Sequence, residues 1–161
     1  MKRLFAAIVG FLVIVPAFGI DKETFDELVD FRLSLQELAV QAHRAPDVLL
    51  ENEAVFILDG VVSGVNVVDS AEESFRATID LVTAEWRDLR SVVMYKGRVV
   101  IEGEAFAARI PSRRRRREPR EGFIERNNRV MVVGTVTSVT DDPETGRSIP
   151  VLDGFYVRTL Q

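Results

Sequence analysis

A short pattern of alternating apolar residues around a glycine recurs along the chain and constrains its fold more than any other feature. The glycine keeps the phase of the apolar residues in Phe56-x-Leu58-x-Gly60-x-Val62, Val99-x-Ile101-x-Gly103-x-Ala105 and Val130-x-Val132-x-Gly134-x-Val136, and Val151-Leu152-Asp153-Gly154 echoes Ile57-Leu58-Asp59-Gly60. Glycine weakens a strand, so inside one it marks a bulge, a bend or a close backbone approach. Strands that coil at glycines are what a small closed barrel requires. The unequal spacing of the glycines argues against a solenoid repeat.

Period-two patterning rich in β-branched residues predicts five strands, at 54–65, 74–86, 97–110, 129–140 and 149–160. Residues 141–147 contain Pro143 and Gly146, which suit the tight turn of a hairpin between the last two strands. Residues 111–128 form a longer connection with at most a short turn near 123–126, because they contain Pro111, Pro119 and Gly122.

Five strands, a long connection after the third and a final hairpin resemble the layout of the OB-fold barrel. Over roughly residues 54–160 the chain resembles small secreted bacterial OB-fold proteins. The segments GRVVIEGEAF and NRVMVVGTVTSV carry this resemblance. The resemblance implies a mainly β fold, a five-stranded OB-like antiparallel barrel over 54–161, and a tendency to bind something on the barrel face. It transfers no catalytic residue. An antiparallel β-sandwich is the alternative fold.

The N-terminus predicts two further segments. Residues 1–19 carry Lys2 and Arg3, then an apolar run to Val15, then Ala17 and Gly19 at the spacing of a cleavage site, which is the layout of a signal peptide. An uncleaved anchor in the inner membrane is the alternative. Residues 20–46 are expected to form one amphipathic helix that covers an end or edge of the sheet, or docks on a partner. Asp21 or Thr24 would cap this helix and Pro46 would end it.

The charge is unevenly distributed. The chain has a net charge of −4 and a pI of about 5.2, yet one stretch of the long connection holds an arginine run with one more arginine close by: Arg113, Arg114, Arg115, Arg116, Arg117 and Arg120. Clustered arginines bind polyanions, and nucleic acid is the usual one. The acidic remainder and the predicted export favour an acidic protein or an anionic envelope component instead. A solvated loop is the simpler interpretation.

Few residues suggest catalysis. The chain has no cysteine and one histidine, His43, which suits the C-terminal end of the helix. Glu102 and Glu104 would share one strand face, either as an acid–base pair or as a solvated face. Asp141, Asp142 and Glu144 fit either a calcium site or a plain turn.

The aromatic residues are assigned mainly to core packing. The rings of the barrel region are Phe75, Trp86, Tyr95, Phe106, Phe123, Phe155 and Tyr156. A single-strand-binding face would instead combine such rings with basic side chains, and the acids Asp80, Glu85 and Glu102 on the same strands argue against that.

These observations together predict a non-enzymatic protein, without cofactor or resident metal. Its expected role is a periplasmic or secreted binding and assembly module of the bacterial cell envelope, contacting a protein or anionic component, with possible peripheral association with the membrane and with nucleic acid as an unlikely partner. The alternative is an OB protein that binds oligonucleotides or acidic glycans along the barrel.

Overall fold

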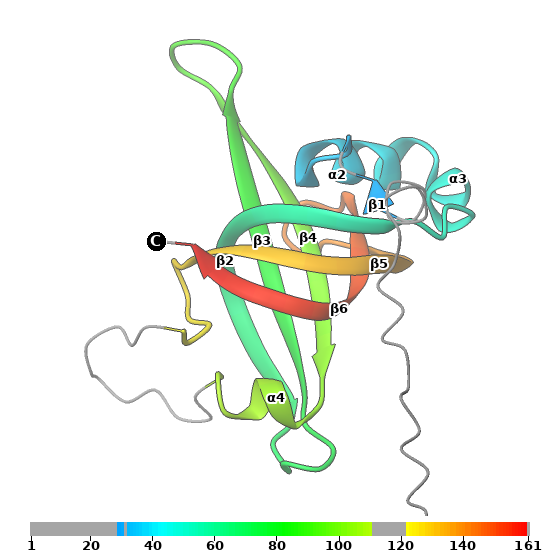
Figure 1. The fold of residues 1–161 in the computed structure, drawn as a ribbon. Helices are drawn as coiled ribbons and strands as arrows, with labels where there is room; N and C mark the ends of the chain where they lie inside the picture. The colour runs from blue at the N-terminus through cyan, green and yellow to red at the C-terminus, as the bar shows by residue number, and fades with distance from the viewer. Residues whose placement is uncertain (1–28, 31, 111–121, 161) are drawn as a thin grey trace, which may run out of the picture.

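Residues 29–30, 32–110 and 122–160 are described by the computed structural model (Figure 1). Five long strands account for most of them: β2 (Val55–Asp69), β3 (Arg76–Trp86), β4 (Val92–Glu102), β5 (Arg129–Asp141) and β6 (Ser148–Leu160). The other elements are short: β1 (Val29–Asp30), α2 (Leu35–Arg44), α3 (Pro46–Leu50) and α4 (Glu104–Ala107). Within the described ranges, no helix has the length and apolar character needed to cross a membrane.

The five long strands close into a barrel. Their order is β2-β3-β4-β6-β5, and β5 pairs again with β2, so the sheet returns to its starting strand. Neighbours are antiparallel except β4 and β6, which run parallel from Arg98↔Val151 to Val100↔Asp153. Closure removes the exposed edges that an open sheet would have. This confirms the predicted OB-like barrel and not the alternative β-sandwich.

The alternating pattern of the sequence builds the core. Every second residue of β3 and β4 points inward, so Ile79 and Leu81 of β3 lie buried beside Val99 and Ile101 of β4. Two helices cover opposite ends of the barrel, α2 at one end and α4 at the other (Figure 1). Leu35 of α2 belongs to the same buried cluster.

Two of the patterned glycines lie where strands come closest together. Gly134 and Gly154 face each other across β5 and β6, next to a register shift. A Cβ at Gly134 would overlap the backbone of Asp153, and one at Gly154 would overlap Val99. The predicted close approach is therefore present at these glycines.

Gly103 does not follow the prediction of a strand over 97–110. It has φ +103° and precedes α4, so β4 ends at Glu102 and Glu104 begins a short helix. Glycine adopts this backbone conformation without strain, and the chain uses it to turn out of the sheet. The pattern Val99-x-Ile101-x-Gly103-x-Ala105 is expected to continue as a strand bent at the glycine, whereas β4 ends just before Gly103.

The N-terminal helix is shorter than predicted. Ser34 caps α2 through a capping box. Its hydroxyl accepts a hydrogen bond from the backbone amide of Glu37, and the Glu37 carboxylate accepts one from the backbone amide of Ser34 at 2.7 Å. The expected caps, Asp21 and Thr24, lie outside the described residues, as does the predicted signal peptide at 1–19, which stays a prediction. Pro46 does end α2, and it occupies the first turn of α3.

Candidate functional site

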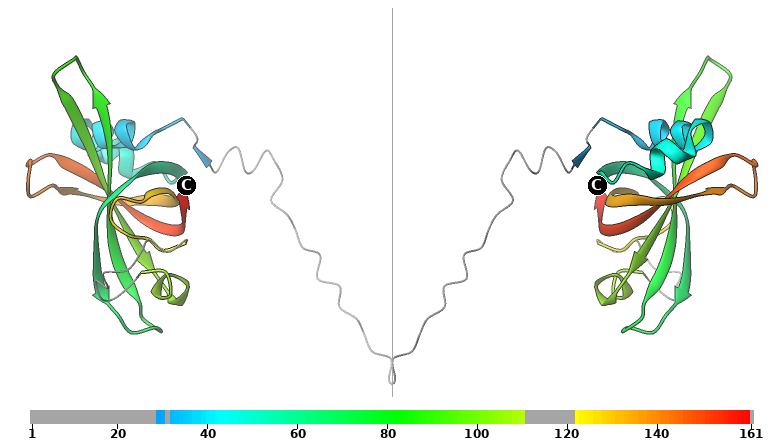
Figure 2. Two further views of the ribbon diagram at one scale, coloured as in Figure 1. Left: turned by 90° about the vertical axis from the view of Figure 1, so that its left-hand side faces the viewer. Right: turned by 90° about the vertical axis from the view of Figure 1, so that its right-hand side faces the viewer.

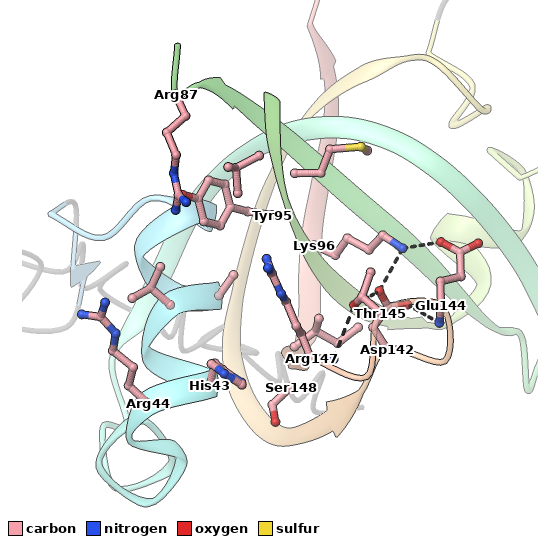
Figure 3. Close-up of a pocket in the computed structure, with 15 residues that line it drawn as sticks. His43, Arg44, Arg87, Tyr95, Lys96, Asp142, Glu144, Thr145, Arg147 and Ser148 are labelled. Atoms are coloured by element: carbon pink, nitrogen blue, oxygen red, sulfur yellow. Dashed lines mark hydrogen bonds and ion pairs between the residues drawn. The ribbon is translucent and has the colours of Figure 1, made fainter. Parts of the chain in front are cut away.

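A cleft of about 490 Å³ lies between three segments that are distant in sequence (Figure 3). Its walls are the outward side of α2, the start of β4 with the end of β3, and the turn between β5 and β6. Apolar side chains form part of the lining, namely Ala39, Val40, Val93, Met94 and Ile149. Polar and charged side chains form the rest, namely His43, Arg44, Arg87, Tyr95, Lys96, Asp142, Glu144, Thr145, Arg147 and Ser148.

One wall of the cleft is fixed by an ion-pair network. Lys96 of β4 donates to Asp142 at 3.0 Å and to Glu144 at 2.5 Å, and Thr145 donates its hydroxyl to Asp142 at 2.6 Å (Figure 3). Asp142 is only 4% exposed. The Thr145 hydroxyl and the Lys96 ammonium hold the pKa of Asp142 below its ordinary value, and Glu144 and Asp142 raise the pKa of Lys96. The network ties the β5–β6 turn to β4.

The network also decides between the two interpretations of this acidic turn. The Asp142 carboxylate already accepts from Lys96 and Thr145, and Asp141 accepts from the Ser148 hydroxyl at 3.1 Å. The segment is thus a turn braced by an ion pair. Among the described residues, no group of three or more metal-ligating side chains is gathered together.

The remaining cations of the cleft form no ion pair with the described part of the chain. Arg44, Arg87 and Arg147 take part in none of the ion pairs found in the described ranges. Figure 3 shows these arginines among the side chains that line the cleft. Counting lysine, arginine, aspartate and glutamate, the lining holds four cationic and two acidic side chains. The cleft is therefore positive on a chain whose net charge is −4.

His43 lies in the last turn of α2, where the sequence placed it, and its side chain lines the cleft. A second contact fixes α2 against the barrel. Glu85 of β3 accepts from Gln36 of α2 at 2.8 Å and from the Tyr95 hydroxyl at 3.3 Å. These bonds link α2 to β3 and, through Tyr95, to β4.

Beside the cleft, β3 and β4 extend past the barrel as a hairpin arm (Figure 2). Trp86, at the end of β3, is 73% exposed, and Leu89 in the turn is 98% exposed. Trp86 pairs with Val92 across the arm. Since side chains alternate along a strand, Val92, Met94 and Lys96 share one face of β4. The ring of Trp86 is therefore on the face that leads to Lys96 in the cleft.

The prediction that the aromatic rings pack mainly in the core is only partly right. Phe75 and Phe106 are buried. Trp86 is not, and neither are Phe155 and Tyr156 of β6. Exposure of these rings follows from their position: Trp86 lies beyond the end of the core, and the β6 rings lie on the outer side of the barrel.

The other acids singled out in the sequence do not form a site within the described residues. Glu102 ends β4 and pairs with Arg76 at 3.0 Å, whereas Glu104 is in the first turn of α4, so they do not share a strand face. Asp80, expected to repel phosphates, is neutralised by Arg98 at 2.8 Å. The arginines at 113–117 and Arg120 lie outside the described residues. No sequence motif marks the cleft arginines, because they come from separate turns and a helix end.

Comparison with known proteins adds fold-level similarities only. No family model and no curated protein matches the chain. A small single-stranded DNA-binding protein from Streptomyces coelicolor is 17% identical with a TM-score of 0.39, covering 68% of this chain and 95% of the other. A Plasmodium falciparum SSB in complex with ssDNA is 17% identical with a TM-score of 0.42, covering 66% and 94%.

Both neighbours are described as single-stranded DNA-binding proteins, the class that the sequence had set aside. Neighbours of this class run against the predicted exported envelope module, its periplasmic or secreted location, its acidic protein or anionic envelope partner and its exclusion of nucleic acid. At 17% identity, with TM-scores of 0.39 and 0.42, they show the fold alone. The prediction had weighed the acidic net charge of the whole chain, whereas the cleft arginines gather only in the folded structure.

Proposed function

We propose that this protein binds single-stranded nucleic acid in the cleft and along the β3–β4 arm, without catalysing a reaction. The observation that carries the proposal is the set of three arginines, Arg44, Arg87 and Arg147, that line the cleft and form no ion pair among the described residues. In the OB-fold, ligands bind across the second and third barrel strands and the loop before the last strand. Those elements correspond here to β3, β4 and the β5–β6 turn, which form two of the cleft walls.

The electrostatics of the barrel support this location. On the outer side of β3 and β4 the basic side chains are already paired: Arg76 with Glu102, Arg98 with Asp80. A phosphate would have to displace a carboxylate to reach them. In the cleft, only Lys96 is committed to acids, so the three arginines are available to phosphates at no such cost.

Trp86 supplies the second requirement of single-strand binding. Bases stack on exposed rings, and each such contact is worth about 1–3 kcal/mol. Trp86 is largely exposed and is followed directly by Arg87, which lines the cleft. A strand whose phosphates contact Arg87 would therefore have a base within reach of the indole.

Binding of a labelled oligo(dT) followed by fluorescence anisotropy tests the proposal. We expect binding at low salt that weakens as salt rises. Each phosphate contact removed should lower the slope of log K against log salt by about 0.7. Arg147→Ser should show that decrease, and Arg87→Ser with Arg147→Ser about twice as much. Arg126→Ser is the matched control, because Arg126 is exposed, outside the cleft and without an ion pair among the described residues.

Trp86 is the only tryptophan of the chain, so its fluorescence reports this position alone. We expect oligo(dT) to quench it and Trp86→Ala to weaken binding by about tenfold or more. A sulfated glycan, which lacks bases, should compete for the arginines and leave the indole emission unchanged. Absence of oligo(dT) binding at low salt, or an equal effect of Arg126→Ser and Arg147→Ser, would refute the proposal.

A further inference from the structure

The outer side of the barrel over β2, β5 and β6 carries a row of apolar side chains. Ile57 pairs with Val133 in the β2–β5 ladder, and Val133 pairs with Tyr156 in the β5–β6 ladder, so the three lie side by side across three strands (Figure 1). Phe155 and Tyr156 are 56% and 47% exposed. The cleft takes in only the start of β6, at Ser148 and Ile149, and does not include these residues.

Strands β2 and β5 are apolar on both faces over this region. Phe56 and Leu58 point into the core while Ile57 points outward, and in β5 Val132 points inward while Met131 and Val133 point outward. Strands that face water on one side normally alternate apolar with polar residues, and strands apolar on both sides are normally covered on both. The sequence of this part of the barrel is therefore that of a sheet with a second layer.

The charged residues beside the row indicate which molecule forms the second layer. Asp153 lies one row to one side of Tyr156, paired with Thr135, and Arg158 lies one row to the other side, paired with Met131. Both are exposed and neither takes part in an ion pair within the described ranges. Consider two copies packed face to face, related by a two-fold axis that lies between them and runs along the row, across the strands. The row of one copy would then stack on the row of the other. The same axis would set Asp153 of each copy opposite Arg158 of the other.

The alternative face-to-face arrangement, with the axis parallel to the strands and over β6, would oppose Asp153 to Asp153 and Arg158 to Arg158. Like charges held together at an interface are unfavourable. The patch is therefore complementary to itself in one orientation, which is the property that a two-fold interface requires. We propose that this face binds a second copy of the chain, with the β2–β5–β6 sheets stacked and the axis along Ile57, Val133 and Tyr156.

Analytical ultracentrifugation of the full chain and its charge variants tests this interface. We expect the wild type to form dimers at about 100 µM, since a patch of this kind supports modest affinity. Arg158→Asp and Asp153→Arg should each weaken the dimer by about tenfold or more, because each creates two like-charge contacts. Combining them restores opposite charges, so the double variant should dimerise within about threefold of the wild type.

Two further variants separate the interface from folding and from nucleic-acid binding. Phe155→Ser with Tyr156→Ser should yield folded monomers, with the circular dichroism spectrum of the wild type. Arg90→Asp reverses an exposed charge at the tip of the arm and should leave the dimer unchanged. A monomeric wild type at about 100 µM, or a double charge variant no better than the single ones, overturns the proposal. Oligo(dT) binding by the monomeric variants is measured separately and does not decide it.

Discussion

Replacing Asp142 with alanine removes the carboxylate that ties the β5–β6 turn to β4. This carboxylate accepts side-chain bonds from Lys96 and Thr145, at 3.0 and 2.6 Å, and a longer one from the Glu144 amide at 3.4 Å, in a site that is 4% exposed. Hydrogen bonds to a charged group in such a site contribute about 1.5 kcal/mol each at the low end, so we expect the free energy of unfolding to fall by about 3 kcal/mol. The melting temperature should fall by roughly 10 °C.

The measurement is urea unfolding followed by far-ultraviolet circular dichroism, with Asp141→Ala as the control. Asp141 is the neighbouring acid in the same turn, is exposed, and makes a single side-chain bond to Ser148, so its removal should cost under about 1 kcal/mol. Equal effects of the two substitutions would refute the reasoning, because they would mean that burial and the Lys96 pair add nothing.

The same carboxylate predicts a pH dependence. The pKa of Asp142 is lower in the folded protein than its ordinary value of 3.8. Its contribution is therefore complete above about pH 4–5 and is lost as the pH falls through 3.8 toward the folded-state pKa. The difference in stability between the wild type and Asp142→Ala should shrink on acidification across that window, and an unchanged difference at about pH 2 would contradict the assignment.

Two further substitutions test how the barrel and its covering helix are held. Gly154→Ala would place a Cβ against Val99 and should destabilise the protein by about 3 kcal/mol, whereas Gly146→Ala, in an open turn with φ +64°, should cost about 1 kcal/mol; equal losses in urea unfolding would argue against the close approach. Ser34→Ala removes the capping box of α2 and should cost about 1 kcal/mol, and hydrogen exchange should show faster opening of α2 but not of β3.

The sequence alone determined the barrel. Alternation of apolar residues is a local property with a period of two, so β3, β5 and β6 could be located to within one or two residues. The glycines at 134 and 154 could be recognised as points of a bulge, a bend or a close approach, and the structure shows the close approach. The prediction failed where one pattern fits two structures. Gly103 keeps the phase of the apolar residues, as in a strand with a bend, but its positive φ ends the strand and turns the chain into α4.

Only the tertiary structure decided the candidate site. Arg44, Arg87 and Arg147 are far apart in sequence and follow no motif, and they meet because barrel closure brings the β5–β6 turn beside β4 and α2. Whether a cation is free also depends on its neighbours in space. Lys96 is held by Asp142 and Glu144, whereas Arg87 and Arg147 form no ion pair among the described residues. The net charge of a chain sums over all its residues, whereas a ligand meets only the charges that folding gathers at one place.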